Sequence, residues 1–157
     1  MSARRTGPFP ALSLPDLEGR EEPLARAWSE GDGLVLIGHR DCKTTRETLP
    51  YFDRLHRRRG AKHALRLVLQ DDPATARALA DSLKLEVPVR LERDPYPLAA
   101  ALGVEVVPTL LLVSPAGEIK QVSEGWSRAD FEAFAVALGV TGAFFTAEDK
   151  APPQKPG

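Results

Sequence analysis

Cysteine and long apolar runs are both scarce in this sequence of 157 residues. Its single cysteine excludes an internal disulfide, so nothing in the chain requires an oxidising compartment. The longest apolar stretch, Val104 to Val113, is interrupted by Glu105 and is too short to cross a bilayer. The opening residues MSARRTGPFP contain two arginines without an apolar segment after them, unlike a secretory signal. We therefore expect a cytoplasmic protein that has no membrane partner.

A large net charge is missing as well. The formal net charge is −1, so no overall field attracts nucleic acid or an anionic surface. Hydrophobic residues make up 43% and charged residues 27%, which is typical of a globular domain, and the length fits one domain. Cysteine, histidine and carboxylates do not show metal-site spacing, and no glycine-rich phosphate loop is present. We expect neither a metal nor a cofactor.

The apolar pattern predicts strands that alternate with helices. Residues 34–37 form a continuous apolar run, as in a strand buried on both faces of a sheet. A helix is expected at residues 43–59, with a kink at Pro50. We expect a hairpin within residues 9–24, a strand at 65–69, a short strand within 87–94, and two strands within 108–125 that are joined by a tight turn at 114–117. Further helices are expected after Asp72, before Gly103 and from Ser127 to Leu138. This order predicts an α/β fold, with a mixed sheet covered by helices on both faces.

The last part of the chain has a different composition. From Ala147 the sequence reads AEDKAPPQKPG, which is rich in proline and charge. Such a segment cannot bury enough apolar surface to offset the entropy of ordering. We expect residues 147–157 to be a disordered tail.

Cys42 lies between a predicted strand and a predicted helix, in the stretch LVLIGHRDCKTTRETLP. The N-terminus of a helix favours a thiolate, because unpaired backbone N–H groups and the helix dipole stabilise negative charge there. Arg40, Lys43 and Arg46 add positive charge nearby, whereas Asp41 opposes them. Two interpretations are open: a reactive thiol, or a buried inert cysteine.

Three segments together resemble the thioredoxin-fold redoxins of the AhpC/TSA and TlpA-like superfamily. DCKTTRETLP matches their C-x-x-C-R-x-x-x-P motif, with Cys42, Arg46 and Pro50 in register. GVEVVPTLLLVSPAGEI matches their G-V-x-x-x-P-T segment, which makes Pro108 the family's cis-proline. GPFPALSLPDLEGREEPL matches their N-terminal hairpin, and residues 72–91 would be the helix–strand insertion. The resemblance covers residues 7–139, which it implies are a thioredoxin-like redoxin domain.

The sequence departs from the family at two motifs. Thr45 stands in place of the second cysteine, and Asp41 in place of a tryptophan that often precedes the first. The peroxiredoxin signature P-x-x-x-T-x-x-C is also absent, since Val35 and His39 occupy its proline and threonine positions. With Thr45 at the resolving position, Cys42 cannot close an internal disulfide.

The resemblance implies a thiol-dependent oxidoreductase that works with a single thiol. Its catalytic residues would be Cys42, Thr45, His39 and Arg46. Its partners would be a disulfide-bearing protein or a peroxide, together with an external thiol that resolves the product. The oligomeric state stays open.

The neighbouring residues each allow two interpretations. His39 would orient a substrate or accept a proton, or else be a hydrogen-bonded histidine at a strand end. Thr45 would donate a hydrogen bond to the sulfur, or else lie on a helix face. The resemblance places substrate beside Val107, Pro108 and Thr109, although an ordinary trans-proline at a strand start is the alternative. A redox-inactive module that binds ligands in the cis-proline groove is the competing function.

Overall fold

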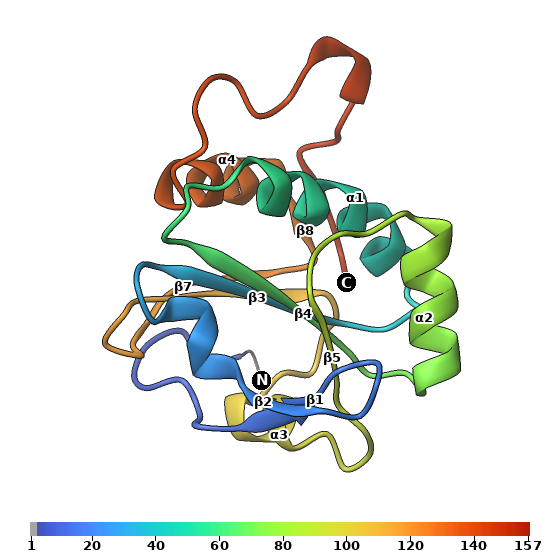
Figure 1. Ribbon diagram of the computed structural model, residues 1–157. Helices are drawn as coiled ribbons and strands as arrows, with labels where there is room; N and C mark the ends of the chain where they lie inside the picture. The colour runs from blue at the N-terminus through green and yellow to red at the C-terminus, as the bar shows by residue number, and fades with distance from the viewer. Residues whose placement is uncertain (1–2) are drawn as a thin grey trace.

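A five-stranded mixed sheet forms the centre of the computed structural model, which describes residues 3–157 (Figure 1). The strands are β3 (Gly33–Gly38), β4 (Ala64–Leu69), β5 (Val89–Leu91), β6 (Thr109–Val113) and β7 (Ile119–Glu124). Their order is β5-β4-β3-β6-β7. Strands β3, β4 and β5 are parallel, whereas β6 is antiparallel to both β3 and β7. The predicted α/β class is confirmed.

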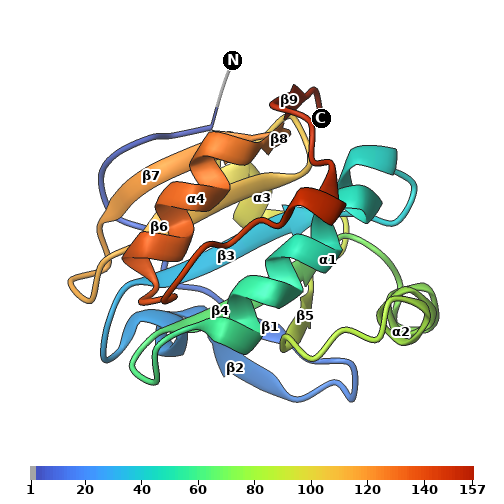
Figure 2. The same cartoon turned by 90° about the horizontal axis from the view of Figure 1, so that it is seen from above.

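Helices cover both faces of this sheet, as predicted (Figures 1 and 2). On one face lie α1 (Lys43–Arg58) and α4 (Arg128–Ala137), with α2 (Pro73–Ser82) beyond the β5 edge. On the other face lie η1 (Leu24–Trp28), α3 (Pro97–Leu102) and the hairpin of β1 (Ser13–Pro15) with β2 (Glu21–Pro23). Because β3 is the central strand, the segment that joins β3 to α1 leaves the sheet at its centre.

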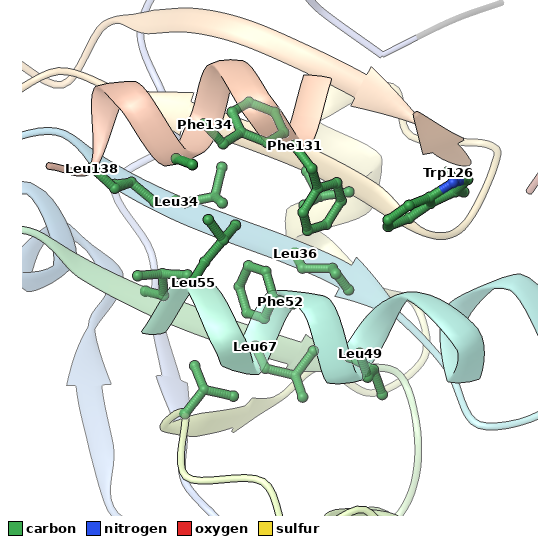
Figure 3. Packing of buried hydrophobic residues seen from close by; sticks show 14 of the residues in the cluster. Leu34, Leu36, Leu49, Phe52, Leu55, Leu67, Trp126, Phe131, Phe134 and Leu138 are labelled. Carbon is green, nitrogen blue, oxygen red and sulfur yellow. The ribbon is translucent and has the colours of Figure 1, made fainter. Parts of the chain in front are cut away.

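Alternation along the strands separates two hydrophobic clusters. In β3, Leu34 and Leu36 pack toward α1 and α4, while Val35 and Ile37 pack toward the opposite layer. Figure 3 shows the first cluster, in which Phe52 from α1 meets β3 and residues of α4. Because both faces are buried, β3 carries the continuous apolar run that its sequence shows.

Several helix boundaries follow the predicted capping residues. Asp72 caps α2 and accepts a hydrogen bond from the Thr75 N–H at 2.7 Å, with Pro73 at the first helical position. Ser127 caps α4 and accepts from the Asp130 N–H at 3.2 Å. Both caps satisfy N–H groups that the helix cannot pair itself.

The structure corrects the expectation of a disordered tail after residue 147. Residues 147–149 form η2 (Ala147–Asp149), and β9 (Gln154–Lys155) pairs antiparallel with β8 (Trp126–Ser127). Just before them, Phe144 and Phe145 are buried in the cluster that contains residues of α1 and α4. This segment is ordered without a core of its own, because it docks on a surface that other elements form.

No helix within residues 3–157 is long and apolar enough to cross a membrane.

Candidate active site

Cys42 is the N-cap residue of α1, where the chain turns from the end of β3 into the helix. Its side chain is half-buried, and its Sγ accepts a hydrogen bond from the Thr45 backbone N–H at 3.4 Å. A sulfur in this position replaces the oxygen of an ordinary capping residue. The positive end of the α1 dipole therefore points at the thiol.

Tertiary structure brings Cys42 to Val107, which lies 65 residues further along the chain. The Cys42 Sγ–H donates to the Val107 carbonyl oxygen at 3.3 Å, and the Val107–Pro108 bond is cis, as the resemblance implies. The contact follows from sheet topology. Because β3 and β6 are antiparallel, with Ile37 opposite Thr109, the end of β3 and the start of β6 meet at one edge.

Thr45 contacts the sulfur through its backbone rather than its hydroxyl. The side chain is fully buried, and its Oγ1 has no hydrogen-bond partner. It packs against Gly38, where an added Cβ would lie 2.7 Å from the Thr45 Cγ2. Gly38 thus leaves the space that the Thr45 side chain fills.

His39 and Arg46 are held by the short loop before α1. The His39 Nδ1 accepts a hydrogen bond from the Asp41 backbone N–H at 3.2 Å. Arg46 is exposed, and its Nη1 donates to the Arg40 carbonyl oxygen at 2.5 Å. These bonds fix the path of residues 39–42, and within residues 3–157 neither side chain is hydrogen-bonded to the sulfur of Cys42.

Thr109 stabilises the loop on the other side of the site. Its side chain is fully buried, and its Oγ1 donates to the Val106 carbonyl oxygen at 2.6 Å. The Pro108 carbonyl oxygen accepts from the Gly125 N–H at 2.8 Å. Both contacts hold the segment that presents the Val107 carbonyl to Cys42.

The cations around Cys42 are paired with carboxylates. Arg40 contacts Asp41 at 3.3 Å, and Lys43 contacts Glu47 one helical turn away at 3.7 Å. Arg40, Asp41 and Lys43 are largely exposed and Glu47 is half-buried, so water screens the effect of these pairs on the thiol. The strongest charge effect near the sulfur is therefore the helix terminus.

A hollow of about 340 Å³ lies beside the site, between α3 and the loop that contains Val107. His39 borders it, together with Tyr96 and Ala100 of the α3 region. Behind His39, burial raises the pKa of the Asp71 carboxyl, although a hydrogen bond from the Arg40 backbone N–H opposes that shift. The hollow offers a surface of mixed polar and apolar character, with the imidazole of His39 at its edge.

The end of the described chain lies against this site, which sequence reasoning missed. The Thr44 Oγ1 donates to the Pro156 carbonyl oxygen at 2.7 Å. A Cβ added to Gly157 would lie 2.5 Å from the Val107 carbonyl oxygen and 2.3 Å from the Val106 Cγ1. Figure 2 shows the chain end beside β8 and the first turn of α1. The local pattern of a proline- and charge-rich segment does not predict such docking.

Within residues 3–157, no cluster of three or more His, Cys, Asp or Glu side chains is arranged to hold a metal ion.

No protein-family model matches this sequence, and no curated protein matches it either. Solved structures do match. A candidate protein disulfide isomerase from Bacteroides thetaiotaomicron aligns with a TM-score of 0.76 at 15% identity, over 88% of this chain and 95% of the other. A candidate thiol:disulfide interchange protein DsbE from Chlorobium tepidum aligns with a TM-score of 0.76 at 19% identity, over 87% of this chain and 96% of the other.

A third similar structure has a different name. The peroxidoxin BcpB from Mycobacterium tuberculosis aligns with a TM-score of 0.71 at 14% identity, over 87% of this chain and 97% of the other. At these identities the likeness concerns the fold. Together with the mixed sheet and the helices on both of its faces, it shows that this chain has a thioredoxin-like fold.

Proposed function

We propose that this protein is a thiol-dependent oxidoreductase in which Cys42 is the reacting group and an external thiol completes each cycle. One observation carries the proposal: the Cys42 sulfur caps α1, with the Thr45 N–H on one side and the Val107 carbonyl on the other. The N–H and the helix dipole stabilise a thiolate. The carbonyl belongs to a fixed loop beside which a substrate would be positioned.

With a disulfide substrate, the Cys42 thiolate attacks one sulfur atom. A new S–S bond joins Cys42 to that half of the substrate, and the other half leaves as a thiolate. Because position 45 carries no second thiol, an external low-molecular-weight thiol attacks the mixed disulfide. It releases the Cys42 thiolate and carries away the bound half as a new disulfide.

With a peroxide substrate, the same thiolate attacks one oxygen of the O–O bond. An S–O bond forms, the O–O bond breaks, and the other oxygen leaves as water or an alcohol after protonation. One external thiol then condenses with the sulfenic acid and releases water. A second external thiol reduces the resulting mixed disulfide, so two thiols are oxidised for each peroxide.

The neighbouring residues receive roles consistent with their contacts. Thr45 acts through its backbone N–H, and Arg46 positions the loop through the Arg40 carbonyl. His39 lies at the rim of the hollow, where its ring would meet a substrate. Pro108 and Thr109 hold the Val107 carbonyl in place.

The names of the similar structures agree with thiol chemistry. They name a disulfide isomerase, a thiol:disulfide interchange protein and a peroxidoxin. These descriptions belong to those proteins, and they support the general class of reaction proposed for this one.

The second candidate function is a redox-inactive binding module. The observation that favours it is the contact between the chain end and the Val107 loop, since this surface already holds an extended segment. In that case Cys42 would serve only as the cap of α1.

Mass spectrometry distinguishes the two functions. After one equivalent of hydrogen peroxide, the protein should gain the mass of a single oxygen at Cys42. Glutathione should then convert this product to a mixed disulfide, which excess glutathione removes. Cys42→Ser should show none of these changes. A wild-type mass that stays constant through the whole sequence of additions would favour the binding module.

A further inference from the structure

We propose that residues 150–157, here called the C-terminal strap, cover the side of Cys42 where an extended polypeptide binds, and that such a substrate has to displace the strap. The proposal rests on the proposed function, because it names the substrate class of the same site. The strap is itself an extended polypeptide, and its end lies on the Val107 carbonyl that Cys42 also contacts. Its contacts show what this surface recognises.

An ion pair anchors the chain where the strap begins. Arg54 on α1 makes two parallel hydrogen bonds to Asp149, each 2.9 Å long. These bonds, and the Thr146 backbone N–H, hold the pKa of the Asp149 carboxyl well below its usual range. The Tyr51 hydroxyl also donates to the Asp149 carbonyl oxygen at 3.3 Å. The anchor fixes the start of the strap and leaves the remaining residues to follow the surface.

The middle of the strap is recognised mainly through its backbone carbonyls. The Trp126 Nε1–H donates to the Pro152 carbonyl at 2.7 Å, and the Arg128 N–H donates to the Pro153 carbonyl at 3.0 Å. Next to them, β9 pairs with β8, with Lys155 opposite Trp126. Carbonyl recognition of this kind accepts many sequences, as in the addition of a peptide strand to a sheet edge.

At the end of the strap, the contacts depend on particular side chains. Lys155 pairs with Glu47 on α1, and this hydrogen bond is the main cause that lowers the pKa of Glu47. The Thr44 hydroxyl holds the Pro156 carbonyl. At Gly157 no side chain fits, because a Cβ would overlap the Val107 carbonyl oxygen. The surface therefore selects an extended chain with a glycine against the Val107 carbonyl and a cation two residues before it.

The strap is held in a way that permits release. A hollow of about 260 Å³, lined by Ala151 and Pro152 of the strap and by Tyr51 and Trp126, leaves the strap incompletely packed against α1. Ala151 is its one buried residue, and most of the others are exposed. A segment with few buried apolar contacts opens at a low free-energy cost while the rest of the protein stays folded.

The experiment compares Lys155→Glu with Lys62→Glu, which makes the same charge change on an exposed residue that precedes β4. In Lys155→Glu, a second carboxylate faces Glu47 and should release the strap. Hydrogen exchange at the backbone amides that pair the strap with β8, such as the Arg128 N–H that donates to the Pro153 carbonyl, should become faster. Alkylation of Cys42 by a maleimide attached to a large polymer should accelerate several-fold, whereas alkylation by iodoacetamide should change little. Lys62→Glu should behave as the wild type in all three measurements.

A second variant and a peptide sharpen the test. Gly157→Val should give the same acceleration, because its side chain cannot lie on Val107, and it perturbs no core residue. The synthetic peptide KAPPQKPG, added to Lys155→Glu, should slow polymer–maleimide alkylation again. The same peptide ending in valine should not.

The outcomes separate this proposal from the proposed function. Faster exchange in the strap with unchanged polymer–maleimide alkylation would overturn the proposal, and so would two variants that change neither measurement. Accelerated alkylation in variants that react with neither disulfides nor peroxide would support the strap and refute the oxidoreductase. None of the three measurements requires redox activity, because hydrogen exchange reports the opening of the strap and the two alkylation reactions report access to the Cys42 thiol.

Discussion

At the scale of single residues, the candidate site depends on one sulfur atom and two backbone groups. The Thr45 N–H and the Val107 carbonyl both lie within hydrogen-bond distance of Cys42 Sγ. Of the side chains that the sequence places nearby, Arg46 donates to a loop carbonyl, and the Thr45 hydroxyl is buried beside Gly38 without a hydrogen-bond partner. The reactivity of the thiol should therefore depend on the helix terminus more than on surface cations.

Alkylation kinetics test this dependence. At pH 6, iodoacetamide should modify Cys42 in the folded protein faster than in the same protein unfolded in urea, because folding places the sulfur at the N-terminus of α1. The unfolded chain is the matched reference, since its thiol has identical sequence neighbours. Equal rates, or a slower rate in the folded protein, would identify Cys42 as an inert cap.

At the scale of secondary structure, the first turn of α1 determines which chemistry is possible. Cys42 and Thr45 occupy the cap and third position of this helix, a spacing that places the Thr45 amide on the sulfur. The two β-carbons therefore lie on the same turn. Under the proposed function, a single thiol in this turn leaves the second reaction step to an external partner.

Thr45→Cys should convert the site to a dithiol. We expect the oxidised variant to form a disulfide between positions 42 and 45 and to reduce insulin when a dithiol reductant is supplied. Mass analysis after alkylation, with and without reduction, checks the bond. Thr48→Cys is the matched control: it is an equally buried threonine of α1, but it lies almost two turns from Cys42. Two freely alkylated thiols in oxidised Thr45→Cys would show that the first turn cannot close.

At the scale of the whole molecule, residues that follow α4 complete the structure. Phe144 and Phe145 join the cluster between α1 and α4, and Tyr51 packs 4.9 Å from Trp126, ring centre to ring centre. In Figure 1 this last segment crosses the α1 and α4 layer before it descends toward the site. The ion pair of Arg54 with Asp149 holds it where it turns.

Asp149→Asn should lower the free energy of unfolding by about 1 kcal/mol at pH 7, as expected for a partly exposed ion pair. Because Arg54 lowers the pKa of the folded-state carboxyl, its contribution is complete above the unfolded value of about 3.9 and is lost as the pH falls below it. The difference between wild type and variant in urea denaturation should therefore shrink between about pH 5 and pH 2. Glu148→Gln, an exposed neighbour, should have no effect at either pH. A difference that stays constant with pH would show that the pair does not stabilise the folded state.

Much of the fold was predictable because the relevant information is local. A continuous apolar run predicted the buried strand β3, and Asp72 with Pro73 predicted the start of α2, since burial and capping impose patterns on neighbouring residues. The approach of Pro108 to Cys42 was predictable only through resemblance to a known family. Roles for His39, Thr45 and Arg46 remain predictions.

Tertiary structure decided the features that depend on distant surfaces. Residues 147–157 were expected to be disordered, because their composition cannot form a core. Their order comes instead from groups on α1, β8 and the Val107 loop, which the chain brings together only after folding. The same reason explains Thr45, whose side chain fills the space that Gly38 leaves at the end of β3 and whose hydroxyl has no hydrogen-bond partner. Local patterns specify helices and strands, whereas the partners of a polar group are chosen by the surfaces that those elements form together.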